Sequence, residues 1–144
     1  MFDLESTSNL ENTSSLTSEL AFSGKRSSKL SAEVEYSTGI LQQTMEMKLS
    51  VPVTRIHFTC RIYSNVEVDA SAVLSAHSDG KQTDWKSFPV HVASADKGKW
   101  ITCEGDWLVD PAVIRNSNYL KMYIWNKQKQ EFFVDDLEFS LYDR

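Results

Sequence analysis

In the segment 119–125, four residues whose side chains could bind a ligand share one parity. Tyr119, Lys121, Tyr123 and Trp125 alternate there with apolar residues, so in a strand their side chains leave the same face. A flat aromatic surface packs against a sugar ring, and basic or amide groups form hydrogen bonds with its hydroxyls. This combination predicts a surface that could bind carbohydrate.

Other segments supply residues of the same kind. Trp85 and His91 share one parity in the segment 85–92, and His77 lies in the segment before it. We predict a carbohydrate-binding site in which rings stack on the sugar and polar groups donate hydrogen bonds, formed by Trp85, Tyr123, Trp125, His77, His91 and Lys121. The alternative is that the tryptophans only pack, since large aromatic side chains are usually well buried. Burial of both Trp85 and Trp125 would exclude the aromatic surface.

The segments that carry these residues have the two-residue period of half-buried strands. Turn-forming pairs such as Asp79-Gly80 and Lys97-Gly98 separate them. We predict an all-β chain, an antiparallel β-sandwich of the jelly-roll type with about eight to ten strands, as a single domain over residues 1–144. We expect a surface loop over 6–18 and a helical turn within 110–116.

Charge and hydropathy argue against several functions. The formal net charge is −5 and no basic stripe is present, so we expect no nucleic-acid partner. No apolar stretch is long enough to span a bilayer, so we expect no membrane insertion. The first residues do not resemble a signal peptide, which fits a cytosolic protein or a module taken from a larger exported one.

Nothing in the sequence points to catalysis. The three histidines, His57, His77 and His91, are far apart, and no nucleophile, zinc or phosphate-loop motif occurs. Asp135 and Asp136 are adjacent, so we expect them on opposite faces of one strand, where they cannot act as an acid/base pair. We therefore predict that the chain is not an enzyme. Turnover of a sugar polymer would contradict this.

The two cysteines, Cys60 and Cys103, form no metal or redox motif. Both have the parity of core residues and could lie on adjacent strands. A disulfide and a pair of buried thiols both remain open, because a bridge needs specific geometry and an oxidising compartment.

Three segments resemble landmarks of the jelly-roll carbohydrate-binding modules with a galactose-binding-like fold. They are Asp3-Leu4-Glu5, the stretch from Ala21 to Leu30 that continues into Glu35-Tyr36-Ser37, and the stretch from Leu120 to Asn126 with the later Val134-Asp135-Asp136-Leu137. Phe22 departs from the pattern, because many members carry histidine there. The resemblance implies a carbohydrate ligand and a structural calcium ion near the chain ends.

Asp135 is the residue that connects this resemblance to the sequence pattern. It shares its parity with Phe133, Leu137 and Phe139, so we expect it to face the apolar side, where a carboxylate must be paired, hydrogen-bonded or metal-bound. By resemblance, the other calcium ligands would be the carboxylates of Asp3 and Glu5 and the backbone carbonyl of Lys25. The alternative is that loop amides satisfy Asp135.

We therefore predict a non-catalytic carbohydrate-binding module, extracellular, on the cell surface or periplasmic, with other domains of a larger protein as further partners. The competing hypothesis is a structural or protein-binding β-sandwich with the same fold and calcium site but no sugar surface.

Overall fold

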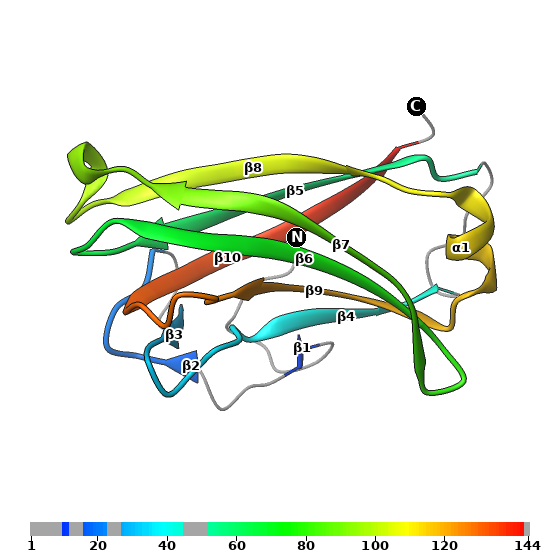
Figure 1. The fold of residues 1–144 in the computed structure, drawn as a ribbon, viewed down its shortest axis with the longest axis horizontal. Coiled ribbons are helices and arrows are strands. Elements are labelled where there is room, and N and C mark those ends of the chain that lie inside the picture. The colour runs from blue at the N-terminus through cyan, green and yellow to red at the C-terminus, as the bar shows by residue number, and fades with distance from the viewer. Residues whose placement is uncertain (1–9, 12–15, 23–26, 45–51, 143–144) are drawn as a thin grey trace.

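The computed structural model describes residues 10–11, 16–22, 27–44 and 52–142. Within these residues, ten strands form two five-stranded antiparallel sheets that pack face to face (Figure 1). Sheet A has the order β1-β4-β9-β6-β7, with β1 Leu10–Glu11, β4 Gly39–Gln43, β9 Tyr119–Trp125, β6 Val68–Ser78 and β7 Lys81–Val92. Sheet B has the order β2-β3-β10-β5-β8, with β2 Leu16–Thr17, β3 Ser27–Leu30, β10 Phe132–Tyr142, β5 Arg55–Tyr63 and β8 Trp100–Leu108. The predicted antiparallel β-sandwich is confirmed.

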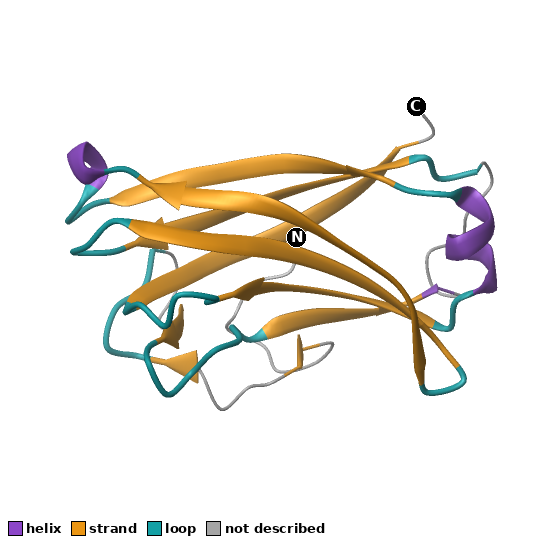
Figure 2. Cartoon of the chain, viewed as in Figure 1, coloured by secondary structure: helices purple, strands orange, loops and turns teal. Residues whose placement is uncertain are grey.

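Helical segments lie at the ends of the sandwich (Figure 2). The helix α1 (Pro111–Asn116) confirms the predicted turn, and a short 3-10 segment, η3 (Ser94–Asp96), precedes β8. Asp110 caps α1, because its carboxylate accepts a hydrogen bond from the Ala112 amide at 2.9 Å and Pro111 needs no amide partner. Within the described ranges, no helix is long and apolar enough to cross a membrane.

The expected loop over 6–18 is wrong in part, because Leu10–Glu11 pairs with β4 and Leu16–Thr17 pairs with β3. The rest of that segment lies outside the described residues.

The core lies between the sheets and follows from strict alternation. On β5, every second residue is buried, and Phe58 packs its ring 4.6 Å from that of Trp107 and 5.4 Å from that of Phe88. Gly105 on β8 faces the ring of Phe88, since a Cβ on residue 105 would come within 2.6 Å of that ring. A larger residue at this position would therefore require the Phe88 ring to move.

Candidate functional site

The outer face of sheet A is a trough with a low centre. β6 runs between β9 and β7, and its outward residues, Ser71, Val73 and Ser75, are short and covered. β9 alternates between buried and partly exposed positions along its whole length, as the sequence pattern predicted. Long side chains of β9 and β7 therefore rise on either side of a floor of small residues.

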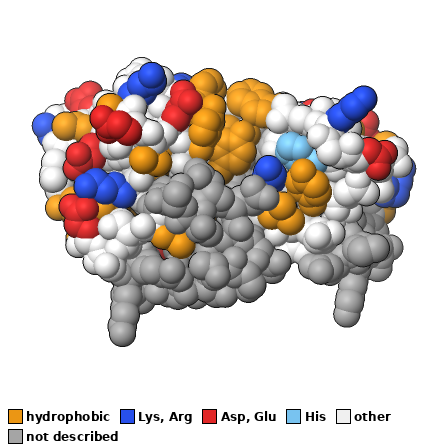
Figure 3. Space-filling model, turned by 90° about the horizontal axis from the view of Figure 1, so that it is seen from below, with side chains coloured by type: hydrophobic (Ala, Val, Ile, Leu, Met, Phe, Trp, Pro, Cys, Tyr) orange, Lys and Arg blue, Asp and Glu red, His pale blue; other side chains and the backbone are white. Residues whose placement is uncertain are grey.

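A cavity of about 320 Å³ opens on this face. Its described lining combines aromatic, hydroxyl, amide and basic groups, from Tyr36, Ser37, Gly39, Ser75, His77, Gln82, Lys121 and Tyr123. In Figure 3, hydrophobic side chains gather on one part of an otherwise mixed surface, with a histidine and a basic side chain close by. The lining has the apolar surface and convergent polar groups of a small-molecule site.

Two tyrosines form one wall of the cavity. The rings of Tyr36 and Tyr123 meet edge to face with centroids 5.7 Å apart, and Tyr36 keeps 45% of its surface exposed. Tyr36 also forms a β-bridge with Trp125, which holds the segment before β4 against β9. The wall is therefore rigid at its base and open to solvent at its edge.

The segment below this wall is fixed by Ser37 and Gly39. The hydroxyl of Ser37 accepts a hydrogen bond from the Ile124 amide at 2.8 Å and donates one to the Thr38 carbonyl at 3.0 Å. A Cβ on Gly39 would lie 2.8 Å from the Met122 carbonyl oxygen and 3.1 Å from the Tyr123 Cβ. The close approach of β4 to β9 therefore requires glycine.

His77 and Lys121 supply basic groups at the other side of the cavity. The His77 ring stacks on Tyr119 with centroids 4.8 Å apart and an interplanar angle of 8°, and its Nε2 lies 2.8 Å from Ser75 Oγ. The Lys121 ammonium lies 5.8 Å from the centre of the Tyr119 ring. Both side chains are thus oriented by neighbouring rings rather than left to sample many rotamers.

Trp85 and Trp125 lie beside the cavity rather than in its lining. Trp85 is 42% exposed and Trp125 is half-buried, so the aromatic surface is not excluded by burial. Among the described residues, the Trp125 indole Nε1 is one of two buried side-chain polar atoms without a hydrogen-bond partner. A buried donor of this kind is unusual.

The structure brings together three of the six predicted residues, His77, Lys121 and Tyr123, with Trp85 and Trp125 alongside. His91 lies farther along β7, where its Nδ1 is 2.8 Å from Asp69 Oδ1. That hydrogen bond raises the pKa of His91. Sequence reasoning did not assign a ligand role to the lining residues Tyr36, Ser37, Gly39, Ser75 and Gln82. Of these residues, only Tyr36 and Ser37 belong to a stretch, Glu35-Tyr36-Ser37, that resembles the carbohydrate-binding modules.

The expected inward orientation of Asp135 is wrong. β10 contains a bulge between Asp135 and Glu138, and Asp136 within it has φ of 49°. The bulge shifts the parity of Leu137 and Phe139 relative to Phe133, so Asp135 lies on the outer face of sheet B, opposite Arg61.

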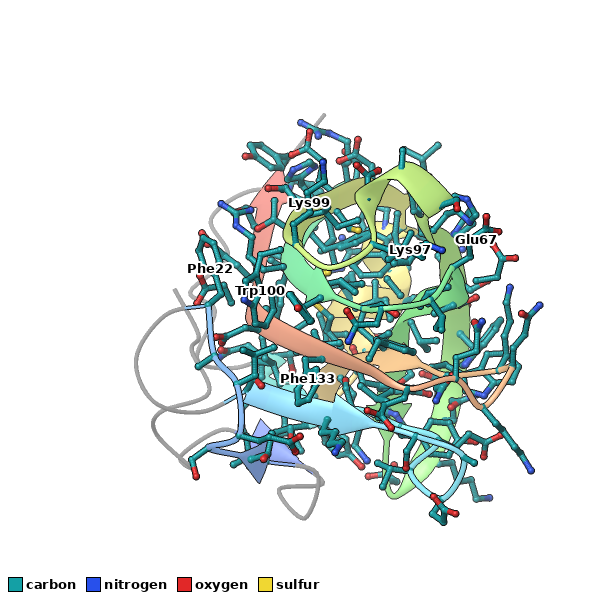
Figure 4. All side chains as sticks on the ribbon, turned by 90° about the vertical axis from the view of Figure 1, so that its left-hand side faces the viewer. Phe22, Glu67, Lys97, Lys99, Trp100 and Phe133 are labelled. Carbon is teal, nitrogen blue, oxygen red and sulfur yellow. The ribbon has the colours of Figure 1, made fainter. Side chains whose placement is uncertain are left out.

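Asp135 is nevertheless only 1% exposed. The Phe22 amide donates to Asp135 Oδ2 at 2.9 Å, and the Asp136 amide donates to Oδ1 at 2.8 Å. Figure 4 shows Phe22 beside Trp100, with Phe133 below them. The other predicted metal ligands, Asp3, Glu5 and Lys25, lie outside the described residues.

Comparisons with solved structures agree with this architecture. The CBM22-2 xylan-binding domain of Paenibacillus barcinonensis Xyn10C matches with a TM-score of 0.60 and 17% identity, over 92% of this chain and 86% of that one. The chain has the fold of a carbohydrate-binding module. The C-terminal family 22 carbohydrate-binding module of Clostridium thermocellum Xyn10B matches with a TM-score of 0.61 and 11% identity, over 88% of this chain and 78% of that one.

A module from another family, a family 16 carbohydrate-binding module, has a TM-score of 0.54 and 12% identity, over 87% of this chain and 83% of that one. No family model and no curated protein matches the sequence. The likeness therefore establishes the shared β-sandwich, and the ligand must be argued from the cavity.

Proposed function

We propose that this chain is a non-catalytic module that binds a polysaccharide in the trough of sheet A. The observation that carries the proposal is the cavity in which the Tyr36–Tyr123 wall faces hydroxyl, amide and basic groups. Sugars need both an apolar ring contact and hydrogen bonds to hydroxyls, and this lining offers both.

Xylan is the first ligand to test, because two of the structural neighbours are described as xylan-binding domains. The module would act outside the cell, at the cell surface or in the periplasm, attached to other domains. One neighbour is joined to an endo-xylanase catalytic module in a single chain. Binding rather than cleavage is supported by the described lining, which does not include the two carboxylates that most glycosidases need.

The test is affinity electrophoresis in gels with and without xylan. We expect retardation of the wild type and a loss of affinity of about tenfold in Tyr36→Ala, which corresponds to about 1.4 kcal/mol. Tyr142→Ala is the matched control, because Tyr142 is similarly exposed, at 42% against 45%, but lies on sheet B. If xylan and other plant polysaccharides retard neither the wild type nor the control, that result would favour a structural or protein-binding module.

A structural calcium ion is a second part of the proposal. Its support is Asp135, a buried carboxylate on the outer face of sheet B, which matches the oxygen ligands that calcium prefers. Asp3, Glu5 and the Lys25 carbonyl would complete the ligand set. We expect a chelator to lower the melting temperature of the wild type but to leave that of Asp135→Asn unchanged. Equal melting curves of the wild type with and without chelator would refute the metal.

A further inference from the structure

Cys60 and Cys103 lie side by side on two adjacent strands of sheet B. β5 and β8 are antiparallel neighbours, and their register pairs Cys60 directly with Cys103. Cys60 is buried in the core, and Cys103 packs against it from the same side. Directly paired residues in an antiparallel ladder have Cα atoms about 4.5–5.5 Å apart, within the span of about 4.4–6.8 Å that a disulfide bridges. The backbone is therefore already placed for a bond between the two sulfurs.

The two free thiols are adjacent but differ in character. The neighbouring Cys103 thiol and burial raise the pKa of Cys60 well above its ordinary value. The neighbouring Cys60 thiol lowers the pKa of Cys103. Cys103 is also only partly buried, whereas Cys60 is fully enclosed. Cys103 is thus the thiol that an oxidant can reach and that more readily forms the reactive thiolate.

We propose that Cys60 and Cys103 form an intramolecular disulfide when the folded protein meets a small-molecule disulfide such as oxidised glutathione. The Cys103 thiolate attacks one sulfur of the oxidant, which forms a mixed disulfide and releases the first small thiol. The Cys60 sulfur then attacks the Cys103 sulfur and releases the second. Two electrons pass from the cysteines to the oxidant, and the two thiol protons end on the released thiols.

The disulfide would link the edge strand β8 covalently to β5. β8 ends the order of sheet B, and its neighbour there is β5. The closed loop runs from residue 60 to residue 103, a separation of 43 residues, and contains β6 and β7, which carry Ser75, His77 and Trp85. Oxidation would therefore restrict the part of the unfolded chain that contributes Ser75, His77 and Gln82 to the cavity, without changing any residue that lines it.

The experiment treats the reduced, folded protein with oxidised glutathione and follows intact mass and titratable thiols. We expect the mass to fall by two hydrogen atoms, both thiols to disappear and the chain to stay monomeric on a non-reducing gel. We expect the melting temperature to rise by roughly 5 to 15 °C and to return when a reductant is added. These measurements use the wild type alone, so they do not depend on whether a variant folds or on the proposed carbohydrate ligand.

Cys103→Ser is the control, because the partly buried position tolerates a hydroxyl better than Cys60 does. We expect it to keep one thiol and to show no redox-dependent change in melting temperature. Persistence of two thiols, accumulation of a glutathione adduct on the wild type, or a disulfide-linked dimer would each overturn the proposal. Loss of xylan binding with normal disulfide formation would instead count only against the proposed function.

Discussion

Trp85 and Trp125 meet edge to face across the middle of sheet A, with ring centroids 6.2 Å apart and planes at 76°. Trp85 lies on β7 and Trp125 on β9, and β6 runs between them. Their register partners on β6 are Ser75 and Ser71, whose small side chains leave room for the two rings to meet. The pair forms a ridge that crosses the trough above β6, so its geometry links the stability of sheet A to the surface that a long ligand would touch.

Removal of one ring should therefore affect both properties. We expect Trp85→Ala to lower the free energy of unfolding by about 1 kcal/mol, because an edge-to-face pair contributes about 0.5–1.5 kcal/mol. We expect xylan affinity to fall about three- to tenfold, whereas Trp85→Phe should keep most of both. Urea denaturation and affinity electrophoresis measure the two effects. Unchanged affinity in Trp85→Ala would show that the ligand does not reach the ridge.

Gly39 is a position where one methyl group should be costly. A Cβ there would lie 2.8 Å from the Met122 carbonyl oxygen, and the neighbouring strand cannot yield without disturbing Tyr123. We expect Gly39→Ala to destabilise the protein by about 1–3 kcal/mol in urea denaturation, as overpacking typically does. Ser87→Ala, at an exposed position on β7, should change stability by less than about 0.5 kcal/mol. A Gly39→Ala variant as stable as Ser87→Ala would refute the close approach.

Ser37 should matter more for its hydrogen bonds than for its size. In Ser37→Ala, the buried Ile124 amide loses the hydroxyl that accepts its proton at 2.8 Å. We expect destabilisation of about 1–3 kcal/mol, the usual cost of leaving a buried donor unsatisfied. We also expect weaker xylan binding, because Tyr36 is the adjacent residue. Ser37→Thr retains a hydroxyl and should recover part of the stability; equal loss in both variants would mean that packing, not hydrogen bonding, dominates.

The pair of His91 and Asp69 should make stability depend on pH. The hydrogen bond to Asp69 raises the folded-state pKa of His91 above its ordinary value of 6.5. The pair therefore stabilises the fold fully below that value, and the contribution is lost as the pH rises through the higher folded-state pKa. We expect Asp69→Asn to reduce stability more at about pH 5.5 than at about pH 9. A histidine titration by NMR in which His91 has the same pKa in both proteins would contradict this.

The alternation of apolar and polar residues in the sequence predicted side-chain orientation correctly wherever strands are regular. Along β5 and β9 the predicted inward and outward residues match the structure position by position. The predicted orientation was wrong at Asp135, because a single extra residue in the bulge reverses the parity of the β10 residues that follow it. The sequence pattern contains no local signal for that extra residue, since both Phe133 and Leu137 are apolar.

The sequence by itself determined the fold class and the face on which each residue of a regular strand lies, because successive side chains of a strand must alternate. Only the tertiary structure decided which strands are neighbours, since pairing joins residues far apart in the chain. That pairing placed Tyr36 against Tyr123, set Cys60 opposite Cys103, and separated His91 from the cavity that His77 and Lys121 line. The binding surface depends on contacts between strands, and no single strand's sequence specifies them.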